Sequence, residues 1–375
     1  MKDKPKRRRI WLFVLIVPLL LCAALAIGSA ISNRSLPTAP QELDRLTAID
    51  TARVTEAFRI KAALGDQVWP GWGSTSIPIV VWNDEYRFLH GYEGQPAGWE
   101  PLAGEEVAGL PVYRAAAREE EQSFAEELVA DVWVGSFSTK WQIDSFFISE
   151  FHDEIIPAPL NEVVPYRLFI IPTEQYVAGM LHETFHAYQA ITARDRFDDA
   201  ETAYRSEEAY WAADEAMRDG WETEIDTLIR ALRAGDDAEA RELAAEFLTQ
   251  RAARREAASL SAVLIDYERR YEWLEGLAKY AEIGIFEAAA GDVGDPVPAL
   301  ADDPDFHGYR NFTQRYNTEI MSMQNTAGNE GDTRFYYTGM AQARLLDRLQ
   351  PGWKDRVMGP GVWLEDLLAE AVAGG

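Results

Sequence analysis

Residues 177–191 read VAGMLHETFHAYQAI, an apolar run with helical spacing that holds two of the chain's five histidines. His182 and His186 are four residues apart, so an α-helix projects both imidazoles from nearly the same face, with Glu183 about 100° further round. This is an HExxH pattern, in which the histidines bind zinc and the glutamate takes a proton from water. We therefore predict that His182 and His186 hold one Zn²⁺ ion and that Glu183 is a general base.

A catalytic zinc ion normally has three protein ligands and one open position. The residues after His186, AYQAI, lack the glycine and third histidine of the metzincin motif. The best candidate for the third ligand is Glu275, in the run WLEGLAKY at 273–280. The small residues Gly276 and Ala278 beside it would let a second helix approach the HExxH helix closely. Rival third ligands are Glu272, Glu282 and His307.

These two segments resemble the gluzincin metallopeptidases, in which an HExxH helix is followed by a helix that supplies a glutamate ligand. The stretch around Glu275 is similar to the WLxEGxAxY-like segment of zinc aminopeptidases. The resemblance covers about 25 residues. It implies a zincin-like fold, peptide hydrolysis, and His182, His186 and Glu275 as zinc ligands with Glu183 as general base.

The chain also departs from that family. His186 and Glu275 are separated by 88 residues, far more than in the classical aminopeptidases, and no GAMEN-like peptide-binding strand precedes the motif. Position 279 is Lys, where thermolysin-like enzymes carry an Asp that supports a zinc histidine. Aminopeptidase specificity is therefore not implied.

Hydrolysis also requires a donor for the oxyanion that develops in the transition state. Gluzincins commonly take a tyrosine or histidine from a downstream helix. Tyr336 and Tyr337 open a predicted helix in the run RFYYTGM at 334–340. We name Tyr337 as the catalytic donor, with His307 and Tyr309 as alternatives.

The composition of the chain limits the kinds of molecule that it is expected to bind. The chain has 62 Asp and Glu against 36 Lys and Arg, a net charge of −26, and one cysteine. A disulfide scaffold and a cysteine-based zinc module are excluded, and nucleic acid is not an expected partner because the chain is so acidic. The expected partner is a peptide or protein substrate.

The first residues have the pattern of a membrane segment. Residues 1–9 are basic and 10–32 are free of charge, a run of 23 residues that is long enough to span a bilayer. The basic tail predicts a cytoplasmic N-terminus, and hence a single-pass protein of the cell membrane with an extracytoplasmic domain. A cleaved signal peptide is the alternative reading of 10–32. Residues 33–40 would be a short tether.

Residues 41–375 contain no linker long enough to divide them, so we expect one zincin-like metallohydrolase domain. The predicted fold class is α+β, mostly helical, with a small N-terminal antiparallel sheet and one transmembrane helix before it. A charged helix is expected at 116–129 and a last strand at 166–171. The other expected strands are 77–82, 86–89, 110–113 and 132–137, and the other expected helices are 41–64, 174–193, 201–233, 237–257, 258–290, 309–324, 335–349 and 362–373.

The pattern favours a membrane-anchored, extracytoplasmic zinc metallopeptidase that uses metal-activated water, with Glu183 as general base. Two alternatives stay open. One is a non-catalytic binding or scaffold protein of zincin fold. The other is a zinc hydrolase of a non-peptide amide or ester, because HExxH activates water without specifying the bond that is cleaved.

Overall fold

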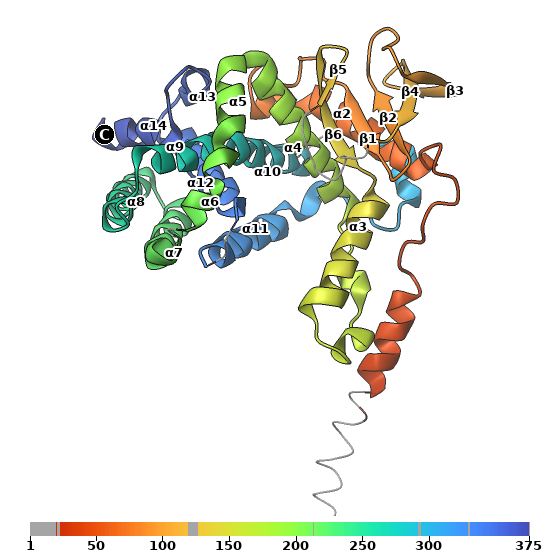
Figure 1. Cartoon of the computed structure of the whole chain (residues 1–375), viewed down its shortest axis with the longest axis horizontal. Coiled ribbons are helices and arrows are strands. Elements are labelled where there is room, and N and C mark those ends of the chain that lie inside the picture. Colours follow the sequence, from red (N-terminus) through yellow and green to blue (C-terminus); the bar gives the residue numbers. More distant parts are fainter. Residues whose placement is uncertain are drawn as a thin grey trace, which may run out of the picture.

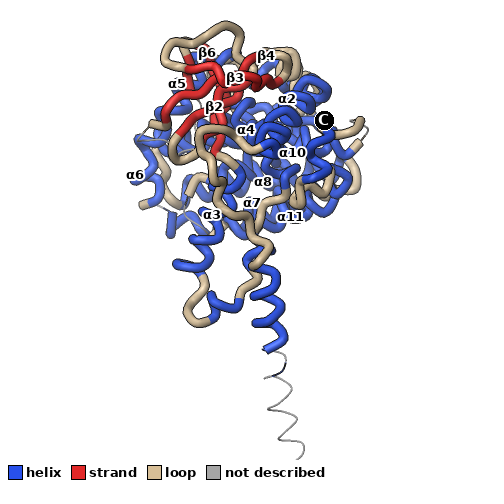
Figure 2. The backbone as a smooth tube through the Cα atoms, turned by 90° about the vertical axis from the view of Figure 1, so that its right-hand side faces the viewer, coloured by secondary structure: helices blue, strands red, loops and turns tan. Residues whose placement is uncertain are grey.

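A six-stranded sheet lies at one end of a mostly helical structure (Figure 1, Figure 2). The computed structural model describes residues 20, 23–118, 127–212, 214–291, 294–328 and 331–374. The strands are β1 (Ile79–Trp82), β2 (Tyr86–His90), β3 (Glu100–Val107), β4 (Leu110–Ala116), β5 (Glu127–Val129) and β6 (Val132–Ser138).

The sheet is mixed, with the strand order β3-β4-β2-β1-β6-β5. β1 pairs antiparallel with β2 and parallel with β6. The prediction of an antiparallel sheet is therefore wrong, because the chain crosses from β4 on one side to β5 and β6 on the other. β1 reads IVVW and is buried at every position, as is typical of a central strand covered on both faces.

Two further differences from the sequence-based prediction concern β3 and the segment before β5. β3 reads EPLAGEEV, a mostly exposed edge strand that apolar alternation does not reveal. No helix is described within 116–129, because Ala116 ends β4 and Glu127 begins β5; residues 119–126 lie outside the described residues.

Helices make up most of the remaining described chain. The α-helices are α2 (Ala48–Val68), α3 (Lys140–Ser149), α4 (Thr173–Thr192), α5 (Arg194–Glu201), α6 (Glu207–Trp211), α7 (Asp214–Leu232), α8 (Asp237–Ala257), α9 (Ala262–Tyr271), α10 (Leu277–Ala290), α11 (Phe312–Thr326), α12 (Thr333–Leu349), α13 (Trp353–Val357) and α14 (Leu364–Ala373). The π-helices are η1 (Glu150–Ile155) and η5 (Glu272–Gly276), and the 3₁₀ helices are η2 (Leu160–Val163), η3 (Tyr166–Phe169), η4 (Thr202–Ser206), η6 (Pro298–Asp302) and η7 (Tyr309–Asn311).

The segment expected as a last strand, 166–171, contains the 3₁₀ helix η3 instead. It belongs to a projection from α3 to η3 that extends away from the sheet in Figure 1, so none of the described strands lies beside it to pair with. Pro165 and Pro172 flank it, and neither can donate a backbone hydrogen bond.

The membrane prediction also needs correction. Within the described ranges, no helix has both the length and the apolar character that crossing a membrane requires. This finding contradicts the transmembrane helix at 10–32 and the single-pass location. The basic tail 1–9 and most of 10–22 lie outside the described residues.

Two glycines allow α12 to cross η5 at very close range. A Cβ atom added to Gly276 would lie 2.5 Å from the Cα atom of Gly339, which is too close for backbone atoms to accommodate. The small residue at position 276 therefore serves the contact with α12, and not the predicted approach to the HExxH helix. This crossing fixes the segment that carries Glu275.

A buried group of ion pairs joins α7, α8, α9, η5 and α14. Arg251 contacts Glu272 through two nitrogens at 2.6 and 2.8 Å. Arg254 donates to Glu268 at 2.6 Å and Arg255 donates to it at 2.8 Å. Burial would raise the pKa of Glu268, but the two arginines lower it to about 2.

We expect Gly276→Ala to lower the free energy of unfolding by about 1–3 kcal/mol, the usual cost of overpacking, because the new methyl group would push α12 away from η5. Urea denaturation measures this. Gly328→Ala is the matched control, since a Cβ there meets nothing within 4 Å. Equal stability of the two variants would contradict the close crossing.

We expect the ion pairs of Glu268 to make the protein sensitive to acid. The pKa of Glu268 is lower in the folded chain than its usual value near 4.5, so its stabilising effect is complete above about pH 4.5 and is lost as the pH falls toward 2. Urea denaturation between pH 6 and 2 should show this decline, and Glu268→Gln should be less stable at pH 6 and show a smaller decline. Glu242→Gln, at an exposed position of α8, serves as control, and an unchanged pH slope in Glu268→Gln would refute the assignment.

Candidate metal centre

Three side chains from two segments converge on one point. The Nε2 atoms of His182 and His186 are 3.1 Å apart, and they lie 3.3 and 3.2 Å from Oε2 of Glu275. Of the His, Cys, Asp and Glu side chains in the described ranges, these three form the one group with ligand atoms close enough to share a metal ion. The structure thus brings together the three residues that the sequence suggested as ligands.

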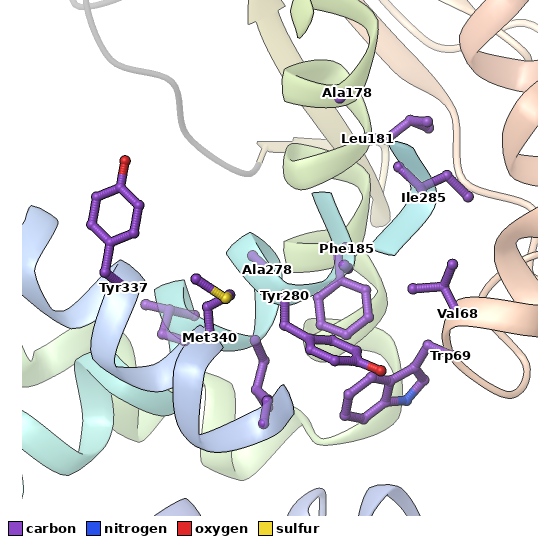
Figure 3. Close-up of a cluster of buried hydrophobic side chains, with 14 of the residues drawn as sticks. Val68, Trp69, Ala178, Leu181, Phe185, Ala278, Tyr280, Ile285, Tyr337 and Met340 are labelled. Carbon is purple, nitrogen blue, oxygen red and sulfur yellow. The ribbon is translucent and has the colours of Figure 1, made fainter. Parts of the chain in front are cut away.

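Core packing on a neighbouring face of α4 fixes the rotation of the helix that carries the two histidines. Phe185 is fully buried and packs edge-on against Trp69 and Trp72, with ring centroids 5.1 and 5.4 Å apart. Figure 3 shows Phe185 and Leu181 pointing into this apolar cluster. On a helix Phe185 lies about 60° from residue 182 and about 100° from residue 186, so its packing fixes the rotation of α4 and leaves the two histidines on an adjacent face.

The β-sheet supports α4 from behind through β6. A Cβ atom on Gly135 would lie 3.0 Å from the backbone nitrogen of Thr184, inside the motif itself. The absence of a side chain at position 135 therefore lets the strand and the motif helix pack at close range.

The π-helical turn η5 presents Glu275 to α4. Glu272, three residues earlier, is held by Arg251 and accepts a hydrogen bond from Oγ1 of Thr338 at 2.7 Å. Gly276 packs on α12. Because Glu272 and Gly276 contact α8 and α12, Glu275 faces the two histidines of α4. Such π-helical turns are often found at functional sites.

The Nδ1 atoms of His182 and His186, on the side of each ring away from the centre, have partners that are consistent with Nε2 as the ligand atom. Nδ1 of His186 lies 3.0 Å from Oε1 of Gln189, an acceptor whose own Nε2 donates to the carbonyl oxygen of Trp273 at 2.8 Å. Nδ1 of His182 lies 3.3 Å from Oε2 of Glu282. Because each Nδ1–H faces an acceptor, we assign both Nε2 lone pairs to the centre.

The electrostatics of the centre favour a bound cation. Burial would raise the pKa of Glu275, but the neighbouring imidazoles of His186 and His182 hold it far below its usual range, so the carboxylate is charged. Burial would lower the pKa of His182, yet Glu275 and Glu282 together raise it. The carboxylate and the imidazoles thus stabilise one another's charged forms, and a metal ion can take the place of the protons.

Glu183 is buried beside the centre on the same helix. Its charge contributes to the raised pKa values of both His182 and Tyr336. The general base that the motif predicts therefore lies in the same neighbourhood as the ligands.

The structure places Tyr336, and not Tyr337, at the centre. The ring of Tyr336 stacks on His182 with centroids 5.6 Å apart and planes at 14°, and the charge of Glu275 acts on its hydroxyl. Burial, followed by the charge of Glu275, raises the pKa of Tyr336 well above its usual value, which keeps the hydroxyl protonated. Tyr337 instead donates to Oε2 of Glu319 at 3.0 Å, and Figure 3 shows that its side chain is not directed at the motif helix.

The rival residues have other contacts. Tyr309 donates to Glu56 at 3.3 Å, and the backbone nitrogen of His307 donates to Glu174 at 3.0 Å. Glu272 belongs to the ion pairs of Arg251, and Glu282 contacts the outer nitrogen of His182. Within the described residues, none of these four belongs to the group of side chains that could hold a metal ion.

Comparisons of the chain with protein-family models, with curated proteins and with solved structures find no match. The geometry of the centre is therefore the basis on which a function can be argued.

We expect the protein to bind one divalent metal ion per chain, and His182→Ala and Glu275→Ala to abolish that binding, because each removes one of three ligand atoms. Metal content after dialysis measures the stoichiometry. His307→Ala, which tests a rival ligand, should retain the full content. Retention of one ion per chain by either ligand variant would contradict the site.

Proposed function

We propose that the chain is a zinc-dependent hydrolase, most specifically a metallopeptidase. Its zinc ligands would be His182, His186 and Glu275, with Glu183 as general base and Tyr336 as the donor to the developing oxyanion. The resemblance of the two motif segments to gluzincins supports peptide bonds as the target.

The spacing of the ligand atoms is the observation that carries the proposal. A tetrahedral ion with metal–ligand distances of about 2.0–2.1 Å needs ligand atoms about 3.3–3.4 Å apart. The three separations here are 3.1, 3.2 and 3.3 Å, close to an equilateral face of that tetrahedron. Calcium, with ligand distances of about 2.3–2.6 Å and six or more oxygens, fits this donor set poorly.

An open fourth position favours catalysis over a purely structural role. Structural zinc sites usually close the tetrahedron with a fourth protein ligand, whereas catalytic sites keep three. In the part of the chain that the structure describes, the group contains three ligands. The side chain of Glu275 also keeps 14% of its surface exposed, more than either histidine.

The protein groups around the centre have complementary roles. A bound zinc ion would act as a Lewis acid and make a water molecule easier to deprotonate. Glu183 would accept that proton and pass it to the leaving group, as general acid–base catalysis requires. The protonated Tyr336 hydroxyl would donate to the carbonyl oxygen as it gains negative charge. Hydrolysis of a non-peptide amide or ester needs the same groups and remains the second candidate.

We expect Glu183→Gln to retain zinc and to lower kcat by a factor of about 10²–10⁴, because the amide cannot accept the proton. Cleavage of a peptide library, read by mass spectrometry, measures this activity alongside metal content. An undiminished rate would refute the role of Glu183. Wild-type protein that carries zinc and cleaves amides or esters but no peptide would favour the second candidate.

We expect Tyr336→Phe to lower kcat by about 10²–10³ with little change in KM, because its hydroxyl would act in the transition state. Tyr309→Phe is the control, since that hydroxyl bonds to Glu56 instead. Equal rates for the two variants would rule out Tyr336 as the donor.

A further inference from the structure

A single carboxylate supports the outer side of His182. Oε2 of Glu282 lies 3.3 Å from Nδ1 of His182, on the side of the ring opposite to the ligand atom Nε2. Glu282 is on α10, one helix after the turn that carries Glu275. The two glutamates therefore contact the same imidazole from its two nitrogens.

Two cationic side chains donate hydrogen bonds to the other carboxylate oxygen of Glu282. Nζ of Lys279 donates to Oε1 at 2.8 Å, and the guanidinium of Arg315 donates to the same atom at 3.3 Å. With Oε1 held by two cations and Oε2 facing His182, Glu282 is fixed beside the ligand triangle and does not enter it. This explains why a residue that was a rival third ligand takes a different position.

A second glutamate completes the group. Glu319 of α11 contacts Nζ of Lys279 at 3.1 Å, pairs with Arg315, and accepts the hydrogen bond from Tyr337. We call Lys279, Glu282, Arg315 and Glu319 the charge quartet. Its four side chains are at most 14% exposed, and its two positive and two negative charges cancel.

This balance of charge has a physical consequence. An unpaired carboxylate in such a buried place would be costly, and it would also compete with Glu275 for a metal ion. Lys279 and Arg315 remove both problems, so Glu282 can accept from Nδ1–H while His182 keeps its Nε2 lone pair directed at the centre. His186 obtains similar support from the neutral Gln189, which needs no counter-charge.

We propose that Glu282, held by the charge quartet, is the positioning residue that orients His182 for metal binding, and that Lys279 and Arg315 keep this carboxylate out of the ligand set. The inference rests on the proposed zinc site, but not on peptide hydrolysis. Tyr337 acquires a role here as well, as a hydrogen-bond donor to the quartet.

The test measures metal affinity directly. The Kd of the full chain for Co²⁺ and Zn²⁺ is determined by chelator competition, and the Co²⁺ absorption spectrum reports ligand geometry. Outer-sphere partners of metal-binding histidines typically contribute 10–100-fold in affinity. We expect Glu282→Ala to weaken binding by that factor and to alter the Co²⁺ spectrum, and Glu282→Gln to lose less, because its amide oxygen can still accept from Nδ1–H.

A matched control separates positioning from general damage. Glu56 of α2 is another buried glutamate with an arginine partner, Arg59 at 2.7 Å, and it contacts none of the ligands. Glu56→Ala should therefore keep the wild-type Kd and Co²⁺ spectrum even where it lowers thermal stability. Lys279→Met should change the Co²⁺ spectrum, since it removes the closer of the two cations that hold Oε1 of Glu282.

The possible results distinguish failure of the positioning role from failure of the proposed function. Wild-type affinity and spectrum in Glu282→Ala, or an equal loss in Glu56→Ala, would overturn the positioning role and leave the proposed hydrolase intact. Wild-type protein that binds Co²⁺ but cleaves no substrate would count against the proposed function while the effect of Glu282→Ala still decides this inference. A wild-type chain that binds no metal would overturn both.

Discussion

The meeting of Glu275 with two imidazoles of α4 is the contact around which the helical part of the structure is arranged. A carboxylate and two histidines lie within 3.1–3.3 Å of one another in a largely buried place. Such a group is stable only if its charges are matched and its geometry is imposed by the surroundings. The core packing of Phe185, the close crossing at Gly276 and the ion pairs of Glu272 each restrain one side of that contact.

Buried ion pairs, in which each charged side chain has an opposite partner, restrain the helices around this contact. The chain carries a net charge of −26, yet its interior pairs arginines and lysines with carboxylates in discrete groups. Arg251 and Arg254 of α8 form ion pairs with glutamates of α7, α9 and α14 next to η5. Lys279 and Arg315 form ion pairs beside His182. Apolar packing alone would hold these helices together but would leave their rotation less well defined, whereas an ion pair with two hydrogen bonds specifies direction as well as distance.

Local patterns were sufficient for part of this arrangement. The spacing of His182 and His186 predicts their common face, and the helix expected at 174–193 is found at Thr173–Thr192. The choice between Tyr336 and Tyr337 could not be made in this way, because neighbouring residues differ by about 100° on a helix and the packing of α12 decides which one faces the centre. The parallel pairing of β1 with β6 and the charge quartet likewise depend on contacts between distant segments, which periodicity does not report.

The long separation between the ligands has a consequence for how the protein is made. Glu275 lies 89 residues beyond His186, and Tyr336 follows later still. During synthesis the two histidines leave the ribosome well before the third ligand exists, and two imidazoles alone form an incomplete site. The proposed catalytic set is therefore assembled only when most of the chain has been translated and folded. Biosynthetic order by itself would therefore keep the proposed site incomplete in the nascent chain.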